Sequence, residues 1–137
     1  MIKIWIVGEK MNKKKIMVVD DKPDQIYTIK QFLEYGNEYE VIGANSGQEC
    51  IELLERNQIP DLILLDVMMP KESGWDVFAK LKEKSEWKEI PVIFLTALTD
   101  DYSKGFGSIA ADDFIEKPYE PDELKDRINK ALKKKKE

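Results

Sequence analysis

Short aliphatic runs recur along the chain and are separated by segments with helical periodicity. The runs span residues 16–19, 41–42, 62–65 and 92–95. They contain no alternating polar positions, so they predict strands that are covered on both faces, as in a parallel sheet. The segments between them carry apolar residues three or four positions apart, which predicts amphipathic helices. These helical segments contain residues 26–33, 51–54, 77–81 and 124–132.

The predicted helices begin and end at residue types that helix termini favour. Ser46, Ser73 and Asp122 stand at N-cap or first-turn positions. Gly36 follows the first helix, where a glycine commonly ends a helix. These positions support the alternation of strand and helix.

The last third of the chain predicts a fifth strand over residues 113–116. Before it, residues 99–111 predict only a short, mobile helix, because Gly105 and Gly107 each cost about 1 kcal/mol relative to alanine. Five strands alternating with helices predict one three-layer α/β/α domain around a parallel five-stranded sheet. In such domains, ligands bind beyond the carboxyl ends of the strands.

The composition narrows the classes of function. The chain has 137 residues, of which 22 are basic and 27 acidic, and its net charge of -5 argues against nucleic acid as the main partner. Cys50 is the only cysteine and there is no histidine, which excludes an internal disulfide, a zinc centre and histidine-based catalysis. Cys50 is therefore expected to be a small buried residue. No apolar run approaches the roughly 20 residues of a membrane span, so we expect a cytoplasmic protein without membrane association.

Five charged or hydroxyl-bearing residues stand at the ends of the predicted strands. Asp20 and Asp21 follow the first strand, Asp66 ends the third, Thr96 ends the fourth, and Lys117 follows the fifth. Neighbouring carboxylates repel one another unless a cation lies among them, and an all-oxygen site favours Mg²⁺. A hydroxyl and an ammonium beside them suit phosphoryl oxygens. The set therefore predicts phosphoryl transfer with a carboxylate as the nucleophile.

Four longer stretches contain these residues: IMVVDD, LILLDVMMP followed by SGWDVFAKLK, IPVIFLTA, and ADDFIEKPYEPDEL. Through them the chain resembles the CheY-like receiver domain of two-component response regulators, of the stand-alone type. The resemblance implies a flavodoxin-like (βα)5 fold with strand order 2-1-3-4-5. It also implies that Asp66 accepts a phosphoryl group from a phosphohistidine of a sensor histidine kinase or phosphotransfer protein.

The resemblance further implies a metal site. Mg²⁺ would be held by Asp21, Asp66 and the backbone carbonyl of Met68, with Asp20 acting mostly through metal-bound water. The bond between Lys117 and Pro118 would be cis, as in other members of the family.

The same resemblance assigns Thr96 and Lys117 to the phosphoryl oxygens. Phe114 matches the family's switch aromatic, which turns inward when Thr96 moves toward the phosphate. Met68 and Leu98 occupy positions that modulate self-dephosphorylation in the family, and both are apolar. Neither side chain can hold an attacking water, so we expect a long-lived acyl phosphate.

The resemblance implies a receiver domain over residues 13–133, with a short segment on each side of it. Residues 1–12 are expected to be a flexible extension or an added edge strand, and residues 134–137 a basic tail. Since no room remains for an output domain, we expect a signalling switch rather than an enzyme with an external substrate. Its output would be altered binding to an unknown downstream protein, as a monomer or a phosphorylation-dependent homodimer.

Other interpretations of the strand-end acids fit less well. A haloacid dehalogenase-type phosphatase needs a second acid two residues after its nucleophile, where Met68 stands. A flavodoxin needs a hydroxyl- and amide-rich phosphate loop after the first strand, where Asp20 and Asp21 would repel the ligand. The remaining alternative is a receiver-fold interaction module that is never phosphorylated.

Overall fold

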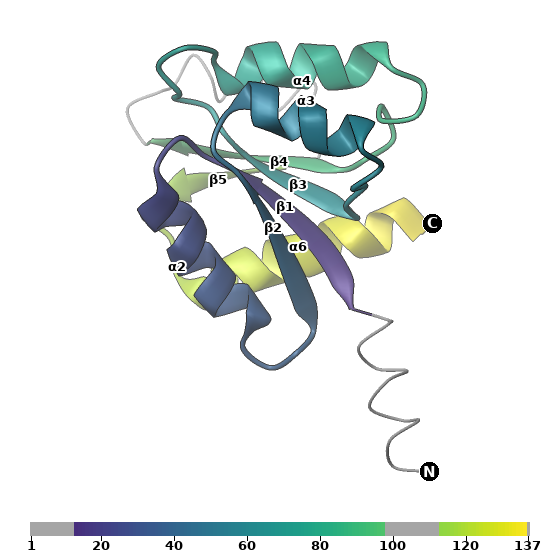
Figure 1. Cartoon of the computed structure of the whole chain (residues 1–137). Coiled ribbons are helices and arrows are strands. Elements are labelled where there is room, and N and C mark those ends of the chain that lie inside the picture. Colours follow the sequence, from purple (N-terminus) through teal and green to yellow (C-terminus); the bar gives the residue numbers. More distant parts are fainter. Residues whose placement is uncertain (1–12, 98–112, 137) are drawn as a thin grey trace.

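The computed structural model describes residues 13–97 and 113–136. The predicted extension at residues 1–12, Leu98 and the weak helix at residues 99–111 lie outside the described residues. The described part forms a layered α/β domain (Figure 1).

The sheet has five strands, all parallel, in the order β2-β1-β3-β4-β5. Their bounds are β1 Lys14–Val19, β2 Tyr39–Ala44, β3 Leu62–Asp66, β4 Val92–Ala97 and β5 Asp113–Lys117. The central strands are buried throughout or nearly so, because both faces of the sheet are covered. The predicted fold and strand order are therefore confirmed. The two edge strands extend further than the sequence predicted.

Within residues 13–97 and 113–136, four helices cover the sheet, two on each face (Figure 1). They are α2 Pro23–Glu34, α3 Gly47–Glu55, α4 Gly74–Glu83 and α6 Pro121–Lys136. The apolar residues of α3 and α4 pack into one buried cluster with side chains of the sheet. Those of α2 and α6 pack into a second cluster on the opposite face. The sheet is thus the middle of three layers, as predicted.

The helix ends use the residues that the sequence indicated. Ser46 caps α3 by accepting a hydrogen bond from the Glu49 N–H at 3.0 Å. Ser73 and Asp76 form a reciprocal capping box at the start of α4. Gly36, with a φ of 93°, follows α2 in the left-handed region that glycine tolerates.

The last helix extends into the expected basic tail. Asp122 lies in its first turn, and α6 continues through Lys136, so residues 134–136 of the expected basic tail are helical. Lysines in a last turn complement the negative end of the helix dipole. Among the described helices, none has both the length and the apolar composition needed to cross a bilayer.

Candidate functional site

Strand register brings the strand-end residues to one edge of the sheet. Asp66, the last residue of β3, pairs with Leu95 of β4, and Ala97 pairs with Lys117 at the end of β5. Asp20 follows β1 directly, and its N–H donates to the Ala44 carbonyl at 3.0 Å. The carboxyl ends of the parallel strands therefore carry the acids, Thr96 and Lys117 together.

Three carboxylates lie close together at this edge. Asp20, Asp21 and Asp66 each offer an oxygen within 4.8 Å of the others. Asp20 is fully buried and Asp66 is 3% exposed. Asp20 Oδ2 and Asp21 Oδ1 are buried and accept no hydrogen bond from the described residues. Buried oxygens without donors are rare in folded proteins and invite a cation. An all-oxygen donor set of this kind fits Mg²⁺.

Lys117 provides a positive charge beside these acids. Its Nζ lies 3.2 Å from Asp66 Oδ1, to which it donates a hydrogen bond, and 3.8 Å from Asp20 Oδ2. Lys117 is the last residue of β5, and the peptide bond between Lys117 and Pro118 is cis. Among the described residues, the Lys117 ammonium thus pairs with two of the three clustered carboxylates, and these groups together carry an excess of negative charge.

The surroundings of Asp66 raise the pKa of its carboxyl above the ordinary value. Burial is the largest cause, and Asp20 adds to the increase through like-charge repulsion. The Lys117 ammonium and a hydrogen bond from the Met68 backbone act in the opposite direction. Met68 itself is 64% exposed. Burial and the charge on Asp20 also raise the pKa of Tyr119, two residues after Lys117, to about 12.

Thr96 lies on β4, next to β3, and Phe114 lies on β5, on the other side of β4. Thr96 is buried, and within the part of the chain that the structure describes its hydroxyl donates a single long hydrogen bond, of 3.4 Å, to the Ala97 carbonyl. Phe114 is half-buried and packs against the buried cluster shared with α3 and α4. Its carbonyl accepts a hydrogen bond from Arg127 Nη1 at 3.1 Å, and the same nitrogen donates to both Asp113 oxygens at 2.8 Å. α6 is therefore tied to the strand that carries Phe114.

Sequence reasoning missed Gly74, which sets the backbone next to Asp66. Its N–H donates to the Val67 carbonyl at 2.9 Å. A Cβ at position 74 would collide with the Asp66 carbonyl oxygen and lie 2.9 Å from the Val67 Cα. Only glycine allows α4 to begin this close to the end of β3. A glycine directly after the capping Ser73 was the one available signal.

Comparisons with known proteins agree with this geometry. The model of the response regulator receiver domain family matches residues 16–129. The chain is 40% identical over 128 residues to "Probable transcriptional regulator ycf27" of Cyanophora paradoxa, covering 90% of this chain and 50% of that protein. It is 37% identical over 122 residues to the alkaline phosphatase synthesis transcriptional regulatory protein PhoP of Bacillus subtilis, covering 88% and 49%.

A solved structure is similar over most of its length. The response regulator receiver domain protein from Clostridium thermocellum superposes with a TM-score of 0.80 at 30% identity, covering 90% of this chain and 97% of that one. The chain therefore matches a complete receiver domain in structure, whereas it spans about half the length of the two sequence relatives.

Proposed function

Because the chain belongs to the family of response regulator receiver domains, we propose that it is a phosphorylation-activated switch with Asp66 as the phosphoacceptor. The observation that carries the proposal is a buried carboxylate in contact with Lys117, beside two further acids at the edge of a parallel sheet. The donor would be a phosphohistidine on a sensor histidine kinase or a phosphotransfer protein.

In the proposed transfer, an oxygen of the ionised Asp66 attacks the phosphorus atom. The O–P bond forms as the P–N bond to the donor imidazole breaks, and the electron pair of that bond returns to the imidazole nitrogen. Lys117, 3.2 Å from Asp66, counteracts the effect of burial and favours the ionised carboxylate that the attack requires. The product is an acyl phosphate on Asp66.

Asp20, Asp21, Asp66 and the Met68 backbone carbonyl are the groups proposed to hold Mg²⁺. When bound, the ion would neutralise phosphoryl oxygens during transfer. The two buried oxygens without hydrogen bonds, on Asp20 and Asp21, support this assignment. Both aspartates would then serve the phosphoacceptor by holding positive charge beside it.

Thr96 and Lys117 are proposed to bind the phosphoryl oxygens once they are attached to Asp66. The Thr96 hydroxyl makes only a long hydrogen bond within the described residues, so it can turn to a better acceptor at little cost. The Lys117 ammonium would move from the carboxylate to a phosphoryl oxygen with a stronger, charge-assisted contact.

Movement of Thr96 would give Phe114 room to turn inward, and the surface of β5 and α6 would change. Arg127 links that movement to α6 through its contacts with Asp113 and Phe114. The proposed output is altered binding of a protein partner to this surface. Such a switch biases an equilibrium between two conformations by contacts that only one of them makes.

Phosphorylation by a small donor tests the assignment. The wild type and Asp66→Asn would be incubated with acetyl phosphate and Mg²⁺, and each intact mass measured. The expected result is one added phosphoryl group on the wild type and none on Asp66→Asn. The wild type should also gain none when a chelator replaces Mg²⁺. Lack of modification of a folded wild type would favour the interaction module that is never phosphorylated. Modification of both proteins would mean that another residue is the acceptor.

A long lifetime of the acyl phosphate is a further part of the proposal. The exposed Met68 side chain beside Asp66 has no group that would orient an attacking water. Met68→Asn and Met68→Glu would add such a group and should shorten the lifetime, while Met68→Leu should leave it unchanged. Decay of the wild-type acyl phosphate within seconds would contradict this part alone.

A further inference from the structure

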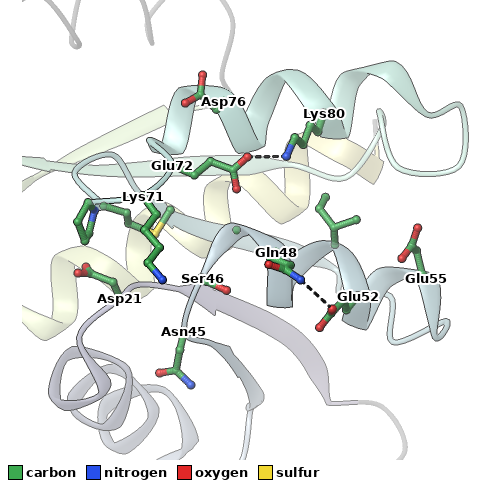
Figure 2. Close-up of a pocket in the computed structure, with 14 residues that line it drawn as sticks. Asp21, Asn45, Ser46, Gln48, Glu52, Glu55, Lys71, Glu72, Asp76 and Lys80 are labelled. Carbon is green, nitrogen blue, oxygen red and sulfur yellow. Dashed lines mark hydrogen bonds and ion pairs between the residues drawn. The ribbon is translucent and has the colours of Figure 1, made fainter.

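A groove of about 980 Å³ lies between α3 and the start of α4, next to the phosphoacceptor site. One wall is the outer face of α3, and the other is the loop after β3 with the first turns of α4 (Figure 2). Asp21 lies at one end of the groove and Glu55 at the other (Figure 2). Its volume falls at the upper end of the range for small-molecule sites, but its open shape suits an extended segment better.

Apolar side chains line part of this groove without being buried. Ile51 and Met69 are half-buried, and Pro70 is exposed. These residues contribute to the hydrophobic effect only when another molecule covers them. The groove therefore offers an occupant some apolar contact area in addition to its polar rim.

The rim carries a clear excess of negative charge. Five acids and two lysines line the groove, and one of the lysines is already neutralised, because Lys80 Nζ lies 2.5 Å from Glu72 Oε2. On α3, Glu52 accepts only a hydrogen bond from Gln48 at 3.3 Å, and Glu55 has no ionic partner among the described residues. Their spacing of three residues places both carboxylates on the same face of α3.

We infer that this groove docks a segment of a partner protein that carries basic side chains around an apolar one. The apolar side chain would cover Ile51 and Met69, and the basic side chains would pair with Glu52 and Glu55. An anionic ligand would be repelled by the rim, and a purely apolar segment would leave both carboxylates without counterions. Charge complementarity thus selects the basic segment.

The inference is independent of phosphoryl transfer. Among the phosphoacceptor residues, the groove shares only Asp21, at its end. Binding to the groove can therefore be measured in Asp66→Asn, which cannot be phosphorylated at that position. A failure of the proposed phosphorylation would leave the docking test unaffected.

The probe is a synthetic peptide of alternating lysine and leucine, carrying a fluorophore, with a glutamate and leucine peptide for comparison. Binding would be followed by fluorescence anisotropy, and its location by backbone amide shifts in a uniformly ¹⁵N-labelled protein. The expected shifts concentrate at residues 45–55 and 69–80. Glu52→Gln with Glu55→Gln should weaken binding of the lysine peptide about tenfold.

The matched control is Glu38→Gln with Glu40→Gln, which removes the same charge at the far end of β2, where both residues are exposed. This pair should change the affinity less than twofold. Equal weakening by both pairs, shifts outside the groove, or equal binding of the glutamate peptide would each overturn the inference. Sedimentation of the free protein provides the last test. If Glu52→Gln with Glu55→Gln abolished self-association, the occupant of the groove would be the lysine-rich end of α6 from a second copy of this chain. That result would overturn the inference.

Discussion

Replacing Asp20 with asparagine is expected to stabilise the metal-free protein. Asp20 is fully buried, and its Oδ2 accepts no hydrogen bond from the described residues. Two other carboxylates have oxygens within 4.8 Å of it. The substitution removes a buried negative charge and keeps the oxygen that accepts the Lys22 N–H hydrogen bond at 2.9 Å. Repulsion is therefore relieved with little change in shape.

The size of the effect follows from the charges around Asp20. At an effective dielectric constant of about 20, two unit charges about 5 Å apart repel by about 3 kcal/mol. At the same dielectric constant the Lys117 ammonium, 3.8 Å from Asp20 Oδ2, attracts it by about 4 kcal/mol. Repulsion from Asp21 and Asp66 together exceeds this attraction by about 2 kcal/mol. A gain of about 1 to 3 kcal/mol in the free energy of unfolding is therefore expected.

Urea unfolding in the presence of chelator measures this gain. The midpoint for Asp20→Asn should lie above that of the wild type, and Glu40→Gln, an exposed acid on β2, should stay within about 0.5 kcal/mol of the wild type. Added Mg²⁺ should stabilise the wild type more than Asp20→Asn, because the variant has lost a carboxylate from the proposed site. An equal or lower midpoint for Asp20→Asn in chelator would refute the electrostatic argument.

Three further outcomes can be checked with the same protein. Burial raises the pKa of Asp66 above its ordinary value of 3.8. The stability that the protonated carboxyl contributes is therefore present below pH 3.8 and is lost as pH rises through the raised pKa. Urea midpoints in chelator should show this loss for the wild type and not for Asp66→Asn. Burial also raises the pKa of the Cys50 thiol to about 12. An aromatic disulfide reagent at about pH 8 should therefore modify Cys50 in the unfolded chain only. Rapid labelling of the native protein would contradict the position of Cys50 in the core. Gly74→Ala should lower the free energy of unfolding by about 2 to 4 kcal/mol and slow phosphorylation. The control Gly36→Ala has open space around it but a φ of 93°, so it should cost about 1 kcal/mol and leave phosphorylation unchanged. Equal shifts in melting temperature would contradict a specific role for the close contact between Gly74 and Asp66.

The central part of the fold was accessible from the sequence because its strands are buried on both faces. The run at residues 62–65 became β3, in which every residue is buried. The edge strand β2 was harder to delimit, since its exposed positions alternate with buried ones and only Val41 and Ile42 formed an apolar pair. A half-exposed strand gives a weaker pattern than a central one. The boundaries of β2 therefore required the structure.

The position of the acids was predictable for a related reason. Residues that follow parallel strands meet at one edge, whichever helices connect them. Contacts that depend on how a helix lies on the sheet were not predictable in this way. The approach of Gly74 to Asp66 and the groove between α3 and α4 both depend on the packing of α4, which sequence spacing does not determine.

The contact between α4 and the phosphoacceptor also gives the protein an optical reporter. Trp75 follows Gly74 directly, and its ring centroid lies 4.2 Å from that of Phe94 in the sheet. Indole emission depends on such local contacts, so a small shift of α4 against β4 would change the fluorescence of this half-buried ring. Trp87, buried after the end of α4, would contribute a steadier background. If occupancy of the acidic edge shifts α4, we expect the change to appear in tryptophan emission without an attached dye.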